Sequence, residues 1–247
     1  MSLVVEAIRP SLVSGIFATR GPFRPQSISD VLLDPSSSYI VGVGPAPKAF
    51  NIEFPDPAYL THIIACDSRR LSISCIQSAT SAWESTDGKM ALPWSLIRLY
   101  YAAFYAAHVI SRLLGEACCW LGSEHISRVD NMYKAISGVS LPSRPESGSY
   151  RCVADSTGRI LQCARVSSAG RGAHEALWSV FDLVLQSASV RALRSSLTTR
   201  DAQSVVAKLD EFRSLSVLHK SQSWLSRTRN ELQYRLEHGA WYPCELT

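Results

Sequence analysis

One segment near the middle of the chain constrains the fold most: an unbroken, alanine-rich apolar run between two arginines. From Trp94 to Gly115 the sequence reads WSLIRLYYAAFYAAHVISRLLG. Its most apolar part, Leu99 to Ile110, is interrupted by His108 and is far shorter than the roughly 20 apolar residues that a membrane-spanning helix needs. The segment therefore predicts a long buried helix and no membrane span, and Pro93 fits the first turn of that helix.

Two stripes of side chains follow this predicted helix, because residues three and four apart share a helix face. The apolar stripe consists of Leu96, Leu99, Ala103, Ala106, Ile110 and Leu113. The polar stripe consists of Tyr101, Tyr105, His108 and Arg112. The alanines predict a neighbour packed closely against this helix in a tight bundle. The polar stripe has two interpretations: a half-buried seam with satisfied hydrogen bonds, or a surface on which His108 contacts a ligand or RNA.

The rest of the chain also favours helices. Helical patterns cover 58 to about 83, 93 to about 121, 123–137, 173–193, 199–220 and 221–236, whereas 1–57 is rich in proline and serine. Two short β-capable runs around a turn predict a hairpin near 149–165. We therefore expect an all-α fold, with a helical bundle over 58–247 that carries this hairpin as an insertion, and an irregular N-terminal extension over 1–57.

Composition limits the classes of function. The 25 basic and 21 acidic residues give a net charge of +4, which excludes a polybasic protein and leaves nucleic-acid binding to a local patch. Seven cysteines without a Cys-x-x-Cys pair favour reduced thiols in a cytoplasm, and the N-terminus lacks the pattern of a secretion signal. Phosphate-binding glycine loops and zinc-protease or serine-hydrolase motifs are missing from the sequence, so we expect neither a metal nor a cofactor.

The last predicted helix is rich in groups that can bind phosphate. Arg227, Arg229 and Arg235 lie there with the amide side chains of Asn230 and Gln233. Guanidinium groups pair with phosphate oxygens through two parallel hydrogen bonds. The alternative is a solvated arginine face that only complements the helix dipole.

Two short motifs resemble the HEPN superfamily of prokaryotic all-helical proteins. They are Tyr-Tyr-Ala-Ala-Phe-Tyr-Ala-Ala-His, from Tyr100 to His108, and Arg229-Asn230-x-x-x-Tyr234-Arg235, and the resemblance spans about 58 to 240. It implies a bundle of four or five helices that forms a homodimer through long helices. It also implies a place in a bacterial toxin–antitoxin or anti-phage system, with RNA or a protein encoded nearby as partner. Active members of the family are metal-independent endoribonucleases with an Arg-x4–6-His motif.

Carried onto this chain, the motif gives Arg229 and Asn230 as catalytic residues but displaces the histidine. Positions 234 to 236 are Tyr, Arg and Leu, and His238 lies about 180° around an unbroken helix from Arg229. Arg235 cannot replace the histidine in moving a proton from a ribose 2′-hydroxyl, because the pKa of an arginine side chain exceeds about 12. The residues expected to contact RNA are Arg227, Arg235, Tyr234, Arg112 and Tyr105.

Three hypotheses follow from the displaced histidine. In the first, the chain is a HEPN-like module that binds RNA or a partner protein without cleaving it. In the second, it is an active endoribonuclease in which His238, or His108 from the central helix, completes the site with Arg229. In the third, it is a helical interaction subunit with no nucleic-acid role. All three place a dimer in the cytoplasm, away from membranes.

Overall fold

The computed structural model describes residues 2–19, 27–84, 92–166, 172–216 and 224–235. This part of the chain combines eight α-helices with a five-stranded antiparallel sheet, so the expected all-α bundle with only a hairpin insertion is wrong. In chain order the elements are α1 (Leu3–Ile8), α2 (Ile28–Leu33), β1 (Ile40–Val43), β2 (Phe50–Glu53), α3 (Pro57–Glu84), α4 (Leu92–Leu113), β3 (Glu116–Leu121), α5 (Ser123–Ser137), β4 (Gly148–Ala154), β5 (Ile160–Arg165), α6 (Ala173–Leu193), α7 (Thr199–Ser216) and α8 (Trp224–Asn230). Two short 3-10 turns, Arg9–Ser11 and Ile16–Ala18, follow α1, and the π-helical turn Glu231–Arg235 extends α8.

The sheet has the strand order β1-β2-β5-β4-β3, and each neighbouring pair is antiparallel. The expected hairpin is present as β4 and β5, but it lies inside a larger sheet. Two of the added strands, β1 and β2, come from the segment expected to be irregular, and Phe50 pairs with Cys163 of β5. The third, β3, occupies residues that were expected to continue the long helix.

The long helix ends early at a glycine. Gly115 has a φ of +80°, a left-handed conformation that favours glycine and stops a helix. Its carbonyl oxygen then accepts a hydrogen bond from the backbone N–H of Ala154 (2.8 Å), so the chain enters the sheet directly as β3. The pairing of β3 with β4 outweighs the weak helical preference of its own residues.

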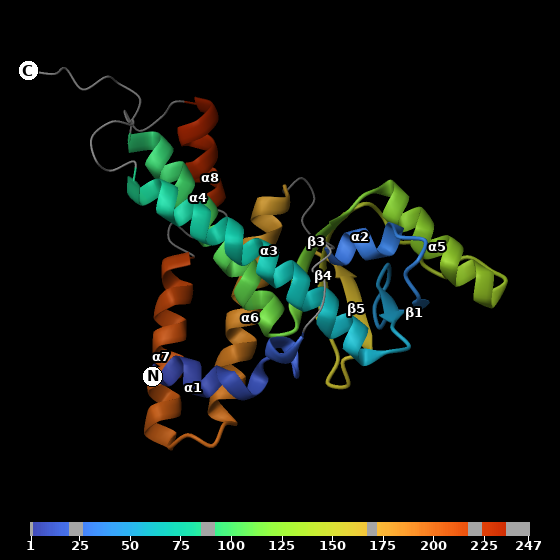
Figure 1. The fold of residues 1–247 in the computed structure, drawn as a ribbon, viewed down its shortest axis with the longest axis horizontal. Coiled ribbons are helices and arrows are strands. Elements are labelled where there is room, and N and C mark those ends of the chain that lie inside the picture. The colour runs from blue at the N-terminus through green and yellow to red at the C-terminus, as the bar shows by residue number, and fades with distance from the viewer. Residues whose placement is uncertain (1, 20–26, 85–91, 167–171, 217–223, 236–247) are drawn as a thin grey trace, which may run out of the picture.

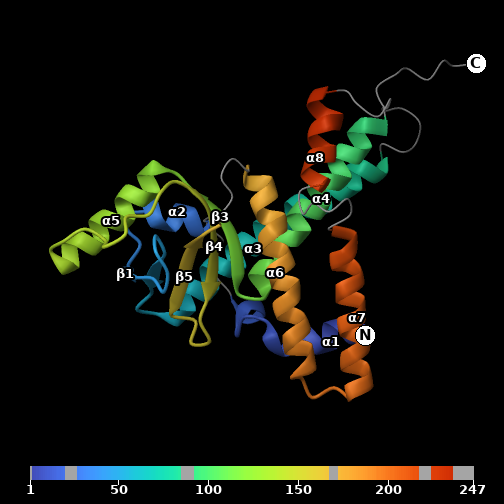
Figure 2. The ribbon, with the colours of Figure 1, turned by 180° about the vertical axis from the view of Figure 1, so that it is seen from behind.

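The described part of the molecule contains two hydrophobic cores that meet at β3. One face of the sheet packs with α2, α3 and α5 around Phe50 and Tyr150, while α1, α4, α6 and α7 enclose the second core around Leu177. Successive residues of a strand point to opposite faces, so Cys119 lies in the first core and Cys118 in the second. Figures 1 and 2 show the sheet and α5 on one side, α6 and α7 on the other, and α3 running across both.

A buried ion pair joins α3 to α4. The Nε of Arg112 donates to Oδ2 of Asp67 (2.5 Å), and Arg70 donates to the other carboxylate oxygen (2.6 Å). Asp67 is fully buried and Arg112 is 4% exposed.

The alanines of α4 are not all packed against neighbours. Ala102 and Ala107 are buried, as a close-packed bundle requires, but Ala103 is exposed. The expectation of a bundle that surrounds α4 was therefore wrong.

Among the described residues, none of the helices has the length and apolar character to cross a membrane.

Candidate functional site

The guanidinium of Arg229 lies between two tyrosine rings at the contact of α8 with α4. Its Cζ is 5.3 Å from the ring centroid of Tyr101 and 5.2 Å from that of Tyr234, distances typical of cation–π contacts. Nη2 donates to the hydroxyl of Tyr101, and Nη1 donates to Oδ1 of Asn230 (2.8 Å). Nε is buried and has no hydrogen-bond partner. Leu232 is buried beside this site and helps to hold the C-terminal helix on α4.

The π-helical turn explains how Tyr234 reaches Arg229. Residues five apart on an α-helix are rotated by about 140° from each other, whereas a π-helix pairs residues five apart along its axis. The turn Glu231–Arg235 is π-helical and directly follows Arg229 and Asn230. It therefore places the Tyr234 ring over the guanidinium, and π-helical turns are frequent at functional sites.

The tyrosines also affect the charge on Arg229. Burial opposes its charged form, but the hydrogen bond to Tyr101 and the nearby hydroxyl of Tyr234 outweigh that effect and raise the pKa of Arg229 above its usual value. Arg229 is therefore a permanent cation on a fixed aromatic support.

The ring of His174, near the start of α6, lies 6.0 Å from the ring of Tyr101, which binds this cation. The Tyr100 hydroxyl is 2.9 Å from Nδ1 of His174 and accepts a hydrogen bond from Nε1 of Trp178 (3.3 Å). Burial raises the pKa of Tyr100 to about 12, so its proton stays in place at neutral pH. Burial and the charge of Arg229 lower the pKa of His174, which keeps its imidazole neutral. When Nδ1 carries the proton and donates to Tyr100, Nε2 is free to accept a proton.

The inner half of the polar stripe has a different environment. Nδ1 of His108 is 2.9 Å from Nη1 of Arg112, whose Nε already binds Asp67. Burial and the neighbouring Arg112 hold the pKa of His108 below its usual value. Of the two interpretations of the polar stripe, the geometry of His108 and Arg112 fits the half-buried seam with satisfied hydrogen bonds. The side chain of Arg112 is too buried to contact RNA.

A continuous aromatic cluster joins the two halves of the stripe. The Phe104 ring lies 4.7 Å from that of His108 and 4.4 Å from that of His174, and Tyr101 stacks on Tyr105 at 6.1 Å. The structure thus brings together on α4, α8 and the π-helical turn the predicted residues Arg229, Asn230, Tyr234, Tyr105 and His108. Arg227 and Arg235 are exposed on the same C-terminal helix, and His238 lies outside the described residues.

Sequence reasoning missed His174 and Tyr100 as members of this site. His174 lies outside both sequence motifs. It comes from α6, a different part of the chain, and its distance from Arg229 depends on how α6 and α8 pack on α4. No spacing within the sequence encodes that packing.

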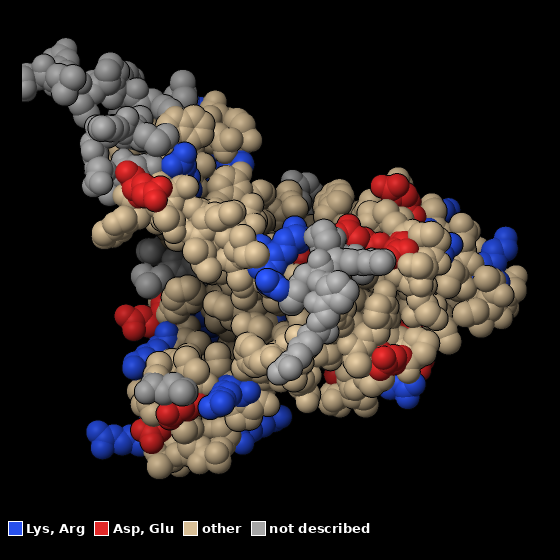
Figure 3. All heavy atoms as spheres, viewed as in Figure 1, with Lys and Arg blue, Asp and Glu red and all other residues tan. Residues whose placement is uncertain are grey.

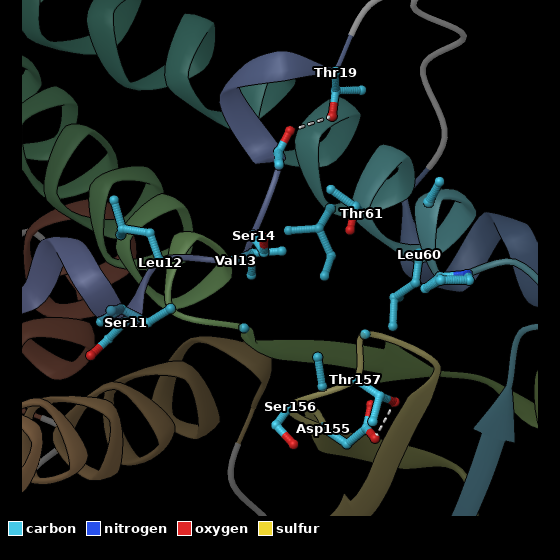
Figure 4. A pocket seen from close by; sticks show the side chains of 18 of the residues that line it. Ser11, Leu12, Val13, Ser14, Thr19, Leu60, Thr61, Asp155, Ser156 and Thr157 are labelled. Atoms are coloured by element: carbon cyan, nitrogen blue, oxygen red, sulfur yellow. Dashed lines mark hydrogen bonds between the residues drawn. The ribbon is translucent and has the colours of Figure 1, made fainter.

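Apart from this cluster, the structure has a large hollow next to the sheet. It has a volume of about 910 Å³ and lies between the segment around Ser11–Thr19, the start of α3 and the β4–β5 turn (Figure 4). The Asp155 carboxylate at its rim accepts hydrogen bonds from the Thr157 hydroxyl (2.6 Å) and from the backbone N–H of Arg159 (3.0 Å), a structural role in its own turn. This hollow contains none of the predicted site residues.

Comparison of the chain with protein-family models, with curated proteins and with solved structures gives no match. In the described part of the chain, no group of three or more His, Cys, Asp or Glu side chains is arranged to hold a metal ion. The geometry around Arg229 is therefore the basis for a functional proposal, together with the two sequence motifs.

Proposed function

We propose that this protein binds single-stranded RNA through the cluster around Arg229. The observation that carries the proposal is the guanidinium of Arg229, which is held between the rings of Tyr101 and Tyr234. A fixed guanidinium pairs with a phosphate, and tyrosine rings stack on unpaired bases; both are standard contacts of single-stranded RNA. Tyr234 is 67% exposed, which leaves most of its side chain open for such stacking.

The charge distribution supports a local contact. Lysine and arginine side chains are scattered over several elements in Figure 3, interspersed with acidic side chains. With a net charge of only +4, affinity has to come from a few well-placed groups. Arg227 and Arg235 on the same C-terminal helix extend the contact to neighbouring phosphates.

The test is a binding titration with a short fluorescein-labelled RNA, followed by fluorescence anisotropy. We expect Arg229→Ala to weaken binding at least about tenfold, since a hydrogen bond to a charged group contributes about 1.5–3 kcal/mol. Arg144→Ala is the matched control, because the Arg144 side chain is exposed and lies in the segment after α5, outside the C-terminal helix that carries Arg229. Equal affinity of the Arg229→Ala variant and the unmodified protein would refute the proposal.

A second candidate function is cleavage of the bound RNA. It is favoured by His174, a neutral imidazole in the same cluster as Arg229. His174 would accept the proton of a ribose 2′-hydroxyl as this oxygen attacks the adjacent phosphorus, while Arg229 stabilises the negative charge that develops on the phosphate oxygens. The P–O5′ bond then breaks, which leaves a 2′,3′-cyclic phosphate, and the leaving 5′-oxygen takes the proton back from the imidazolium or from water. His174 would thus take the role that the sequence analysis gave to His238 or His108.

Cleavage is tested with a 5′-labelled RNA on a denaturing gel in the presence of a metal chelator. We expect His174→Ala to abolish cleavage and to keep most of the RNA affinity, whereas Arg229→Ala loses both. If the unmodified protein leaves the RNA intact, the site binds without catalysis.

The biological setting and the assembly belong to the same proposal. We place the chain in a bacterial toxin–antitoxin or anti-phage system, as a homodimer with a further partner encoded nearby, because its two motifs resemble HEPN proteins. The fold does not add support, since the bundle of that family is not what this chain forms. The six cysteines among the described residues are free thiols, which supports a cytoplasmic location.

A further inference from the structure

Two buried cysteines face each other across the β4–β5 hairpin. Cys152 of β4 is the direct partner of Cys163 of β5 in the antiparallel register. Their sulfur atoms are 3.3 Å apart, and each residue is 1% exposed. Both side chains lie in the hydrophobic core beside the sheet, whereas the tyrosines that hold Arg229 belong to the other core. The chemistry of this pair is therefore separate from that of the proposed RNA site.

The backbone hydrogen bonds show which kind of position the two cysteines occupy in the ladder. The N–H of Val166 donates to the carbonyl oxygen of Ser149 (2.8 Å), three positions along the ladder from Cys152 and Cys163. Hydrogen-bonded and non-hydrogen-bonded pairs alternate in an antiparallel ladder, so the cysteines form a non-hydrogen-bonded pair. The Cα atoms of such a pair are about 4.5 Å apart, within the range of about 4.4–6.8 Å that a disulfide bridges.

A third thiol lies nearby but at a different register. Cys119 of β3 is directly opposite Tyr150, so it is only a diagonal neighbour of Cys152. Diagonal neighbours on adjacent strands are about 7–8 Å apart, which is beyond the usual reach of a disulfide. The register of the sheet therefore selects Cys163, and not Cys119, as the partner of Cys152.

We propose that Cys152 and Cys163 are an oxidation site at which hydrogen peroxide forms a disulfide within the folded sheet. The sulfur of one cysteine attacks the O–O bond and becomes a sulfenic acid, and the thiol proton leaves with the displaced hydroxide as water. The second sulfur then displaces the hydroxyl group from the sulfenic acid, so that an S–S bond forms and a second water leaves. Each sulfur loses one electron, and the peroxide gains both.

Burial determines how fast the pair reacts and with which oxidant. The hydrogen bond from Cys119 lowers the pKa of Cys152, but the contact with Cys163 and burial outweigh it and hold this pKa well above its usual value. Oxidation is therefore slow at neutral pH, because the thiolate is the reactive form. Hydrogen peroxide is small and uncharged, so it suits a site that has almost no exposed surface.

The test is peptide mapping of the full chain after oxidation without denaturant. Trypsin cleaves after arginine, so Cys152 and Cys163 fall in two different peptides, 152–159 and 160–165. The reduced protein is incubated with hydrogen peroxide, its remaining thiols are alkylated, and the digest is analysed by mass spectrometry without reduction. We expect the two peptides to be joined, with a mass lower than their sum by two hydrogen atoms, and to separate in dithiothreitol. Recovery of the two peptides unlinked overturns the proposal.

Two matched variants test the choice of partner, and circular dichroism confirms that each is folded. Cys119→Ala should form the link to the same extent as the unmodified protein. In Cys163→Ala, Cys152 should stay unlinked, although Cys119 is still present. Loss of the link in Cys119→Ala, or a bond between Cys152 and Cys119 in Cys163→Ala, overturns the assignment of the pair.

A second readout tests whether the native sheet accommodates the bond. The two cysteines are 11 positions apart, and a disulfide that closes a loop of this length should lower the unfolding equilibrium constant about a hundredfold. Urea unfolding of the oxidised protein, with and without dithiothreitol, measures this difference. An oxidised protein that unfolds at the same or a lower urea concentration than the reduced protein overturns the proposal. None of these outcomes depends on RNA binding.

Discussion

Removing the Asp67 carboxylate should be among the most damaging single changes in this protein. Asp67 is fully buried and holds Arg112 and Arg70 with its two oxygens. In Asp67→Ala the guanidinium of Arg112 stays buried and keeps only His108 as a partner. Breaking a buried pair from one side costs about 3–5 kcal/mol, because the remaining charge is uncompensated. For a chain of this size that is about 6–20 °C in melting temperature.

The assay is urea unfolding at pH 7, followed by far-UV circular dichroism. Arg70→Ala is the comparison variant: Arg70 binds the same carboxylate, but half of its side chain is exposed, so its loss should cost about 1 kcal/mol or less. The double variant Asp67→Leu, Arg112→Met should recover most of the lost stability, because apolar replacement of a buried pair is often neutral. If Asp67→Ala costs less than about 1 kcal/mol, the carboxylate does not hold α3 to α4 as described.

Three further outcomes are expected. Phe50→Ala should lower the free energy of unfolding by about 3–5 kcal/mol in chemical denaturation, because Phe50 is fully buried against Tyr150. Gly115→Ala should cost about 1–2 kcal/mol in the same assay, because its φ of +80° is unfavourable for alanine although a methyl group would fit. Because folding lowers the pKa of His174, this side chain is protonated at a higher pH in the unfolded chain than in the folded chain. Stability should therefore decrease from pH 7 to pH 5, and less steeply in His174→Gln, as measured by unfolding at both pH values.

The elements with a strong helical period could be predicted from the sequence. The expected helix over 173–193 is α6, that over 123–137 is α5, and that from 58 to about 83 is close to α3. Their apolar residues recur every three or four positions, a signal contained within each segment. The β4–β5 hairpin could be predicted for the same reason, since its turn and its two strands are adjacent in the chain.

The rest of the sheet could not be predicted, because its strands pair with distant partners. β2 is four residues long and pairs with β5, more than a hundred residues away. The segment that becomes β3 has no β-branched residue to favour a strand, although Gly115 before it was a usable stop signal for the helix. The same limit applies to the candidate site: the C-terminal motif pointed to Arg229, but only the packing of α6 on α4 adds His174.

The position of β3 between the two cores affects how the molecule unfolds. Its side chains alternate between the two cores, so separating the sheet from the helical half would expose Cys118 if β3 stayed with the sheet, and Cys119 if β3 left with the helices. Local excursions that spare one half are thus costly, and those amide protons of β3 that bond to β4 should exchange with deuterium only at the rate of complete unfolding. A chain with two distinct interiors would in this way lose its structure in a single cooperative step.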